Sequence, residues 1–301
     1  MKGILLAGGR GTRLDPLTRT TSKQLLPIFD KPIIHYPLAT LMLAGVREIL
    51  VVTTPVHASQ FRSLLGTGSQ WGIRLEYLTQ PEPQGIAQAL SLGRSFLGTD
   101  SCFLMLGDNV VIGPNTGRSL GSWPSTDHAQ VFGIEVADPR PYAVVELGSS
   151  GEPVSIEEKP ARPMGHLAVP GMYLYPPGVA DIADDLAVSD RGEYEITDVN
   201  RWYLERRRLS VTRMPRGTAW LDTGTPELMN AAGNLVRILQ ERFGQRIADL
   251  DEISFRMGLT SRSMLFDSAQ SAAQADRRDY LLRILEEADE DDLEPLPDET
   301  R

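Results

Sequence analysis

Short apolar runs alternate with stretches of helical periodicity through the first third of the chain. The pattern predicts strands at 2–7, 48–53, 74–79 and 102–107, and between them helices at 32–44, 57–65 and 85–97. The first of these helices is placed with Pro32 in its first turn and Asp30 as its N-cap. Strands that alternate with helices are joined by right-handed crossovers, so we expect a parallel sheet that is buried on both faces.

The pattern changes in the second half of the chain. Strand-like runs separated by short polar breaks, which are typical of antiparallel strands added to a sheet, lie at 130–136, 143–147, 153–156 and 167–174. Helical periods follow at 178–185, 196–206 and 226–243, and then through most of 245–290. We therefore expect an α/β domain over 1–243, with a mixed, largely parallel central sheet flanked by helices, and a helical C-terminal part over 244–290.

Charge is distributed unevenly along the chain. The formal net charge is −10, but residues 286–301 hold nine acidic side chains and one arginine, which leaves about −2 for the rest. A disordered, solvated end is the simplest interpretation of the acidic tail 291–301, and a partner-binding role is the alternative. Net acidity argues against a nucleic-acid partner. Because the sequence has neither a signal peptide nor an apolar run of about 18 residues, we expect a cytoplasmic protein without membrane contact.

Side chains suited to nucleophilic catalysis are not concentrated anywhere in the sequence. Cys102 is the only cysteine and lies in an apolar run, so we expect a buried structural thiol. The four histidines are scattered, which favours surface or core positions: His35, His57, His128 and His166.

The loop after the first strand is the first candidate site. The strand runs directly into Gly-Gly-Arg-Gly-Thr-Arg at residues 8–13. Successive glycine N–H groups can form an anion-binding concavity, and arginine adds a fork of donors suited to phosphate oxygens. The loop also lies at the carboxyl end of a strand, where open α/β sheets bind their ligands. It is a candidate polyphosphate cradle, with a glycine turn that binds nothing as the alternative.

Two common glycine-rich loops are excluded. A Walker loop needs Gly-Lys-Ser/Thr, whereas this loop continues Gly-Thr-Arg. A dinucleotide-binding loop needs a third glycine where Leu14 stands, and an acidic residue at the end of the second strand, where Thr53 and Thr54 stand. The same differences argue against an NAD-linked oxidoreductase.

A series of further motifs follows in order from Met1 to about Leu259. They are Leu-Ala-Gly-Gly-x-Gly-Thr-Arg-Leu at 6–14, Ser-Lys-Gln-Leu-Leu-Pro at 22–27, and the segments 66–72, 80–85, 106–109, 157–160, 192–200 and 219–225. Together they resemble sugar-1-phosphate nucleotidylyltransferases, and among these the short glucose-1-phosphate thymidylyltransferases. The resemblance implies a Rossmann-like fold with a mixed sheet and a helical C-terminal part, which agrees with the pattern above.

The reaction that the resemblance implies joins dTTP and glucose 1-phosphate, or a related sugar 1-phosphate, into a dTDP-sugar and pyrophosphate. The attacking phosphate oxygen is already ionised, so catalysis needs charge neutralisation and in-line positioning rather than a general base. Mg²⁺ is the implied cofactor, with Asp108 and Asp222 as its ligands. Taken alone, either aspartate could instead cap a helix or a turn.

The resemblance also implies which residues bind each substrate. Arg13 would grip the β- and γ-phosphates, Lys23 would steady the α-phosphate, and Lys159 would hold the sugar phosphate, so these three are the implied catalytic residues. The implied nucleotide-binding residues are Gly8, Gly9, Gly11, Thr12, Arg13, Gln80, Gly85 and Asp108. The implied sugar-phosphate residues are Tyr142, Ala143, Glu158, Lys159, Val169, Tyr173 and Arg191.

Base and sugar specificity stay open at this point. The Gln80 amide can pair with the imide edge of thymine, but uracil shares that edge, so uridylyl transfer is an alternative, as is guanylyl transfer. Ala143, Ile112 and Pro170 depart from the family pattern around the acceptor. An altered sugar or pseudo-sugar pocket, as in secondary metabolism, and neutral drift both explain these changes. An inactive sensor of sugar nucleotides is a further alternative, although both aspartates and the Arg13–Lys23 pair are present.

Regulation and assembly are implied by the resemblance alone. Relatives of this kind are commonly tetramers with a second nucleotide site that allows end-product inhibition. The corresponding regions of this chain are 113–120 and the predicted helix around 228–239.

Overall fold

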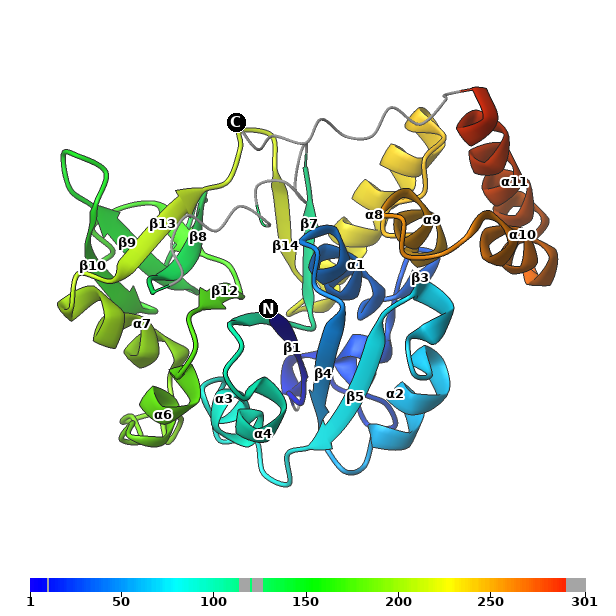
Figure 1. Cartoon of the computed structure of the whole chain (residues 1–301). Coiled ribbons are helices and arrows are strands. Elements are labelled where there is room, and N and C mark those ends of the chain that lie inside the picture. The colour runs from blue at the N-terminus through cyan, green and yellow to red at the C-terminus, as the bar shows by residue number, and fades with distance from the viewer. Residues whose placement is uncertain (10, 114–119, 121–126, 291–301) are drawn as a thin grey trace, which may run out of the picture.

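Four parallel strands form one half of the central sheet in the computed structural model, which describes residues 1–9, 11–113, 120 and 127–290 (Figure 1). The register places Ile4 between Leu50 and Leu104, and all three side chains are buried. The order across this half is β6 (Cys102–Leu106), β1 (Lys2–Ala7), β4 (Glu48–Thr53) and β5 (Arg74–Thr79). The four strands predicted from apolar runs are confirmed, and β1, β4 and β6 are largely buried because helices cover both faces, while the edge strand β5 is partly exposed.

Two groups of helices supply that cover. On one face, the apolar side chains of α1 (His35–Leu43) and α2 (Ala58–Leu65) form one buried cluster with Leu5, Val51 and Met105. On the other face, Ile4 and Leu50 pack against α3 (Gln88–Leu92) and α4 (Arg94–Leu97), and the same cluster continues to α6 (Val179–Asp184) and α7 (Ile196–Glu205).

The second half of the sheet is mainly antiparallel, as expected. β12 (Met172–Tyr175) joins the two halves, because it pairs antiparallel with both β6 and β8 (Ala129–Glu135). The sheet continues through β11 (Leu167–Val169), β9 (Ala143–Leu147) and β10 (Pro153–Glu158), while β13 (Leu209–Arg213) pairs parallel with β8. The predicted fold class, a Rossmann-like mixed sheet flanked by helices, is confirmed.

Two predicted elements are each divided in the structure. The expected helix 85–97 is broken into α3 and α4 at Gly93, where a Cβ would lie 2.8 Å from Ile4 Cδ1 of the sheet. The expected strand 167–174 is divided into β11 and β12, because Pro170 has no N–H to donate to a ladder. Gly171 follows, and a Cβ there would lie 2.3 Å from the side chain of Leu106.

The predicted start of the helix 32–44 is wrong. Lys31–Pro32 is a short strand, β3, that pairs with β2 (Pro27–Ile28), and α1 begins only at His35. Asp30 does not cap this helix. Its carboxylate instead contacts the ammonium of Lys31 and, at 3.0 Å, the guanidinium of Arg246. Asp30 therefore forms ion pairs with Lys31 and Arg246 instead of the predicted helix cap.

A second two-stranded ribbon was not predicted at all. It joins β7 (Asn109–Ile112) to β14 (Ala219–Asp222), which are antiparallel and far apart in the sequence. Figure 1 shows the ribbon standing between the antiparallel half of the sheet and the C-terminal helices. β7 starts directly after β6 and Gly107–Asp108, so the ribbon extends from the carboxyl end of the central strand β6.

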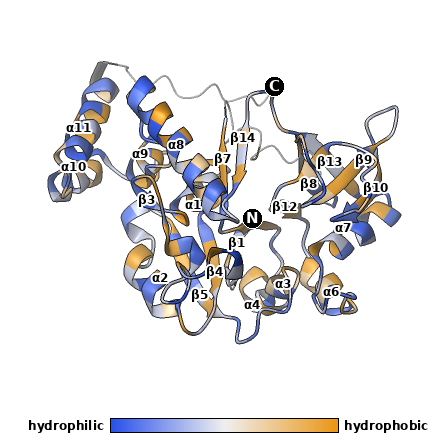
Figure 2. Cartoon of the chain, turned by 180° about the vertical axis from the view of Figure 1, so that it is seen from behind, coloured by the Kyte–Doolittle hydropathy of each residue, from blue (hydrophilic) through white to orange (hydrophobic). Residues whose placement is uncertain are grey.

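The described part of the chain ends in four helices, α8 (Pro226–Phe243), α9 (Leu250–Arg256), α10 (Arg262–Ser271) and α11 (Ala275–Glu290). The expected helix 226–243 and the helical pattern over 245–290 are thus both found, and α8 ends at Gly244 with φ of 65°. Figure 2 shows apolar residues gathered in the central strands and polar residues on the outer faces of α8 and α11. The acidic tail 291–301 lies outside the residues described.

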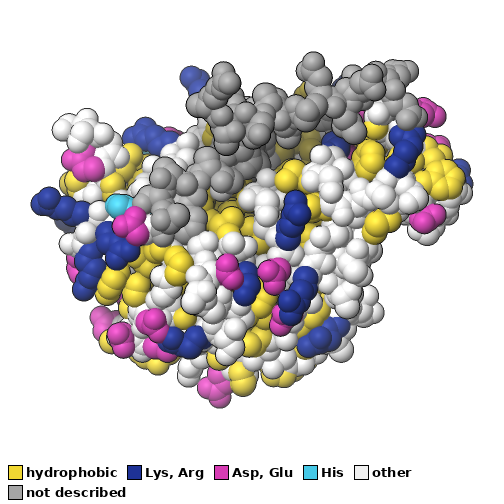
Figure 3. All heavy atoms as spheres, in the orientation of Figure 1, with side chains coloured by type: hydrophobic (Ala, Val, Ile, Leu, Met, Phe, Trp, Pro, Cys, Tyr) yellow, Lys and Arg dark blue, Asp and Glu magenta, His cyan; other side chains and the backbone are white. Residues whose placement is uncertain are grey.

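Burial and charge also differ between the core and the surface of the molecule. Cys102 is fully buried in β6, and burial raises the pKa of its thiol far above the ordinary value, so this cysteine is an inert core residue. On the face drawn in Figure 3, basic and acidic side chains are interspersed over the antiparallel half of the sheet. Within the described ranges, no helix combines the length and the apolar character needed to cross a membrane.

Candidate active site

The glycine loop lies where β1 ends and forms one wall of a cleft of about 600 Å³. Gly8, Gly9 and Thr12 line this wall, while Arg10 lies outside the described residues. Gly11 has φ of +59°, and the Thr18 hydroxyl donates a hydrogen bond of 2.9 Å to its carbonyl oxygen. A residue other than glycine would be strained here, so the turn that shapes the cradle depends on this glycine.

Another part of the cleft wall comes from the segment after β5 and from the segment before α7. Gln80, Gly85 and Arg191 all line it. Gly85 has φ of +118°, and a Cβ there would lie 2.4 Å from the carbonyl oxygen of Tyr194. The Tyr194 N–H also donates to the Gln84 carbonyl oxygen at 2.7 Å. These contacts join two segments that are over 100 residues apart, and the expected base-binding residues line the same cleft as the expected phosphate-binding loop.

The β7/β14 ribbon brings the two predicted metal ligands together. Asp222 lies directly opposite Asn109 in the ribbon, one residue beyond Asp108. The Thr223 hydroxyl donates to the Asp108 carbonyl oxygen at 3.0 Å and ties the strand ends together. The Asp108 carboxylate is 2.7 Å from the ammonium of Lys23, whose side chain is only 8% exposed. Two aspartates and a lysine from three distant segments therefore meet at one strand end.

Asp222 has a second set of neighbours. Its Oδ1 is buried and has no hydrogen-bond partner among the described residues. Burial, together with the nearby Asp222 carboxylate, raises the pKa of Tyr142 to about 12. The Arg13 guanidinium lies against Gly224, where a Cβ would be 3.0 Å from it. The ring of Tyr142 packs on Trp220 with 4.5 Å between centroids.

The donors at this point suit a magnesium ion. Carboxylate oxygens are the protein ligands that Mg²⁺ uses, usually one or two of them, with water and substrate phosphate in the other positions. A buried carboxylate oxygen without a partner is costly unless a ligand completes it, and Asp222 Oδ1 is such an atom. Within the described ranges, no cluster of three or more His, Cys, Asp or Glu side chains could form a site made of protein ligands alone. Asp108 and Asp222 therefore fit a metal that is shared with a substrate.

The residues implied for the sugar phosphate form a neighbouring group. Register pairs Ala143 with both Glu158 and Val169, and the Lys159 N–H donates to the Tyr142 carbonyl oxygen at 3.1 Å. Lys159 itself has φ of 44°, a backbone conformation that is uncommon for a residue with a side chain. Together these pairings line up the implied sugar residues along the edges of β9, β10 and β11.

Glu158 is the centre of the polar contacts in this group. Its Oε2 accepts a hydrogen bond of 2.6 Å from the Thr197 hydroxyl, and its Oε1 is 3.6 Å from both Lys159 Nζ and Arg191 Nη1. Tyr173 is buried, and burial raises the pKa of its hydroxyl, with the Glu158 charge adding to the shift. The carboxylate is thus held between two cations and two hydroxyl-bearing side chains.

Arg191 is surrounded by carboxylates. Burial alone would lower the pKa of its guanidinium, but Glu193, Glu195 and Glu158 outweigh burial and raise it. The guanidinium lies 2.9 Å from Glu193 and 3.1 Å from Glu195. Burial in turn raises the pKa of the Glu195 carboxyl.

Several residues at the site carry contacts that the sequence reasoning did not assign. They are Thr197, Glu195 and Trp220. All three lie inside motifs that resemble the family, so motif membership was the available signal. Which of the motif residues touch one another was not visible in the sequence, because their partners lie in distant segments.

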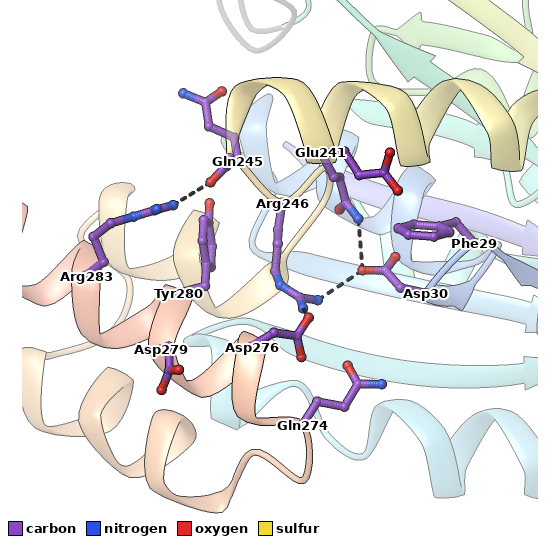
Figure 4. A pocket seen from close by; sticks show the side chains of 12 residues that line it. Phe29, Asp30, Glu241, Gln245, Arg246, Gln274, Asp276, Asp279, Tyr280 and Arg283 are labelled. Atoms are coloured by element: carbon purple, nitrogen blue, oxygen red, sulfur yellow. Dashed lines mark hydrogen bonds and ion pairs between the residues drawn. The ribbon is translucent and has the colours of Figure 1, made fainter.

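Other cavities lie among the C-terminal helices, and their described lining includes none of the predicted site residues. One of about 650 Å³ lies between α8, α11 and the turn at Phe29–Asp30 (Figure 4). There Arg246 contacts both Asp30 and Asp276, so the charged groups neutralise one another. A cavity of about 560 Å³ reaches Ile112 and Gly113, but residues 114–119 of the expected regulatory region lie outside the described residues.

Comparisons with known proteins show the family of the chain. The family model described as nucleotidyl transferase matches residues 2–237. A glucose-1-phosphate thymidylyltransferase of Mycolicibacterium smegmatis is 48% identical over 286 residues, which cover 95% of this chain and 99% of that protein. A crystal structure from Bacillus anthracis assigned to the same activity, in complex with sucrose, has a TM-score of 0.73 and 37% identity, covering 79% of this chain and 95% of that one. A UDP-glucose pyrophosphorylase with UDP-glucose has a TM-score of 0.71 at 24% identity, covering 79% of this chain and 98% of that one, and supports the fold alone.

Proposed function

This chain belongs to the nucleotidyl transferase family, and on that premise we propose that it transfers a thymidylyl group from dTTP to glucose 1-phosphate. The products are dTDP-glucose and pyrophosphate. The observation that carries the proposal is the meeting of Lys23, Asp108 and Asp222 at one end of the sheet, beside a glycine-lined cleft. Relatives with that activity, alike over 95% of the chain, supply the substrate pair.

The glycine loop and its cations act on the triphosphate. The N–H groups of Gly8, Gly9, Gly11 and Thr12 and the Arg13 guanidinium bind the β- and γ-phosphates, which become the leaving pyrophosphate. Lys23 lies beside the α-phosphate and stabilises the charge that spreads over its oxygens in the transition state. The ion pair with Asp108 holds Lys23 in a fixed place, so little rearrangement is needed when the phosphates bind.

Asp108 and Asp222 would hold Mg²⁺, which supplies neutralisation of phosphate charge when bound. The assignment explains why one Asp222 oxygen is buried without a hydrogen-bond partner, because this oxygen would be a ligand of the metal. Tyr142, whose ring packs on Trp220, lies beside this carboxylate.

The acceptor binds on the other side of the ribbon. Lys159 and Arg191 bind the phosphate of glucose 1-phosphate and orient its oxygen toward the α-phosphate. Glu158 and Tyr173 bind sugar hydroxyls, while Ala143 and Val169 form the wall behind the ring. The nucleophile arrives ionised, so the roles of these residues are charge neutralisation and alignment.

The proposal also covers the location of the reaction, its pathway and the assembly of the protein. We place the reaction in the cytoplasm, where nucleoside triphosphates and sugar phosphates are available, and in a pathway to a deoxysugar such as those of secondary metabolism. We also propose a homotetramer regulated by a sugar nucleotide at a second site, for which the cavity beside Gly113 is the candidate.

A substrate matrix tests the proposed activity. Purified protein with Mg²⁺ is given dTTP, UTP, GTP or CTP together with glucose, galactose, mannose or glucosamine 1-phosphate, and pyrophosphate release is followed, with mass spectrometry of the products. We expect the dTTP and glucose 1-phosphate pair to exceed every other pair in kcat/KM. A higher value with UTP or with another sugar would replace the proposed substrates, and release with no pair would reject the activity itself.

A further inference from the structure

Three glutamine residues form a hydrogen-bonded chain beside the nucleotide cleft. Gln88, the first residue of α3, accepts a hydrogen bond of 3.1 Å at Oε1 from the backbone N–H of Gln84. The same oxygen accepts from the side-chain Nε2 of Gln80. In return, Gln88 Nε2 donates to the Gln84 side-chain oxygen at 2.9 Å. Each polar atom of the Gln88 amide is therefore engaged.

The backbone N–H decides which way each amide faces. A side-chain amide can be turned by 180° with little change of shape, so its orientation follows from its hydrogen-bond partners. A backbone N–H can only donate, so the Gln88 atom that faces Gln84 must be the oxygen. Because that oxygen also faces Gln80, the Gln80 atom there must be the donor, Nε2. The Gln80 oxygen must then lie on the other side.

That other side is the cleft. The Gln80 side chain is 2% exposed, and its Oε1 approaches the glycine loop so closely that a Cβ on Gly8 would lie 3.0 Å away. Gln80 and Gly8 both line the cleft. None of the described residues donates a hydrogen bond to this oxygen, while the Gln80 N–H is occupied by the Thr53 carbonyl oxygen at 2.7 Å. The cleft thus presents the Gln80 oxygen as an acceptor whose orientation is set by the contacts of Gln88.

We propose that Gln88 is a positioning residue that sets base specificity, because it turns the Gln80 oxygen toward the base. A fixed acceptor pairs with a base that has a ring N–H in the middle of its pairing edge, as thymine and uracil have at N3. Cytosine has a lone pair at N3, so its nitrogen would face the Gln80 oxygen with no proton between them. The inference rests on the proposed function and adds to it a reason for excluding cytidine nucleotides.

The test compares variants that remove the Gln88 acceptor with a variant that keeps an acceptor there and with a control variant at Gln84. Gln88→Met has a similar length but no strong acceptor, and Gln88→Ala removes the same acceptor without adding bulk. Gln88→Glu keeps an acceptor at that position. Gln84→Ala is the matched control, because it removes the exposed side chain that Gln88 contacts but leaves the backbone N–H that fixes the amide. Thermal unfolding checks that each variant is folded.

Two measurements are made with dTTP, dUTP and dCTP. The first is kcat/KM with glucose 1-phosphate, and the second is the Kd of each nucleotide by calorimetry without the sugar phosphate. We expect Gln88→Met and Gln88→Ala to lower the preference for dTTP over dCTP by about tenfold, with dUTP following dTTP. Gln88→Glu and Gln84→Ala should keep the wild-type preference.

The two measurements separate the inference from the proposed function. If Gln88→Met and Gln88→Ala keep the wild-type preference, or if the wild type does not prefer dTTP over dCTP, the inference is overturned while thymidylyl transfer can stand. If no nucleotidyl transfer is found but the calorimetric preference depends on Gln88, the proposed function fails and the inference stands.

Discussion

At the residue scale, the environment of Asp222 Oδ1 is the strongest indication that the site binds a metal ion. This oxygen is buried and has no hydrogen-bond partner among the described residues, although its neighbours Tyr142 and Arg13 are polar. Leaving a buried charged oxygen unpaired costs several kcal/mol, and such a cost persists where a ligand normally completes the group. The folded chain without ligand is therefore expected to be less stable here than it would be with a neutral side chain.

Asp222→Asn tests that reasoning. The amide has the same shape but no charge, so we expect kcat to fall by about 100-fold or more, as when one electrostatic contact to a transition state is removed. In the absence of Mg²⁺, the free energy of unfolding should not decrease, because Oδ1 has no hydrogen bond to lose and an amide oxygen can still accept the hydrogen bond from Tyr142. Turnover is measured over a magnesium titration, and unfolding is measured in urea.

Asp185→Asn is the matched control for this prediction. Asp185 is an exposed carboxylate at the end of α6, so its loss should leave both turnover and its magnesium dependence unchanged. Turnover of Asp222→Asn close to that of the wild type at every magnesium concentration would contradict the assignment of this carboxylate to the metal.

At the element scale, the sequence predicts the strands that are long and apolar but not the ribbon that makes the site. β1, β4 and β5 are runs of six residues, and their pattern is visible in a short window. β7 and β14 have four residues each, and their pairing joins Asn109 to Asp222 across more than 100 residues. Local periodicity has no information about a pairing of that kind.

The same limit applies to the start of α1 and to the residue roles. Pro32 is a favourable residue for the first turn of a helix, but its pairing with Pro27 in a small ribbon takes precedence. Motif resemblance predicted candidate site residues, and the structure places Gly8, Gly9, Thr12, Gln80, Gly85 and Arg191 in one cleft. The contacts of Thr197 with Glu158 and of Gln88 with Gln80 depend on tertiary packing, so they could not be predicted from the sequence motifs.

One side chain holds the ribbon together, and its loss is predicted to destabilise the fold. The Trp220 indole N–H donates to Asn109 Oδ1, and the Asn109 side chain is almost fully buried. Trp220→Phe removes the donor and leaves that oxygen unpaired, so the free energy of unfolding should fall by about 1–3 kcal/mol. Urea unfolding measures the change.

Trp202→Phe supplies the comparison. Trp202 lies half-buried on α7, and its indole N–H has no partner among the described residues, so the same substitution there removes ring area without breaking a hydrogen bond. We expect a loss below about 1 kcal/mol. Equal losses for the two variants would show that the Trp220 hydrogen bond does not stabilise the ribbon.

At the scale of the whole molecule, charged pairs join the C-terminal helices to the α/β body. Arg246 bridges Asp30 of the body and Asp276 of α11, and Arg277 of α11 lies 3.1 Å from Asp249 at the start of α9. Lys31 donates to the Ile247 carbonyl oxygen at 2.9 Å. Removing one member of a buried pair is strongly destabilising, so the attachment of these helices depends on such contacts.

His35 is the group at this interface whose protonation changes in an accessible pH range. It begins α1, its ring meets Trp71 edge to face, and it lines a cavity of about 310 Å³ under the C-terminal helices. Its Nε2 is buried without a partner, and burial lowers its pKa from 6.5 to about 4. The charged groups that face it are Lys31, Asp249, Arg277 and Asp30, whose effects on the pKa are smaller than that of burial.

The sign of the pH dependence follows from these two pKa values. Between pH 6.5 and 4 the unfolded chain binds a proton at this histidine and the folded chain does not, so falling pH favours unfolding. The loss reaches about 3 kcal/mol at the acid end of the window. His35→Phe keeps a ring against Trp71 but cannot titrate, so from pH 7 to 4 it should lose about 3 kcal/mol less stability than the wild type. Urea unfolding at several pH values gives the difference, with His166→Phe, a change at an exposed histidine, as the control. Identical pH profiles for His35→Phe and the wild type would mean that acid weakens the molecule through its carboxylates alone.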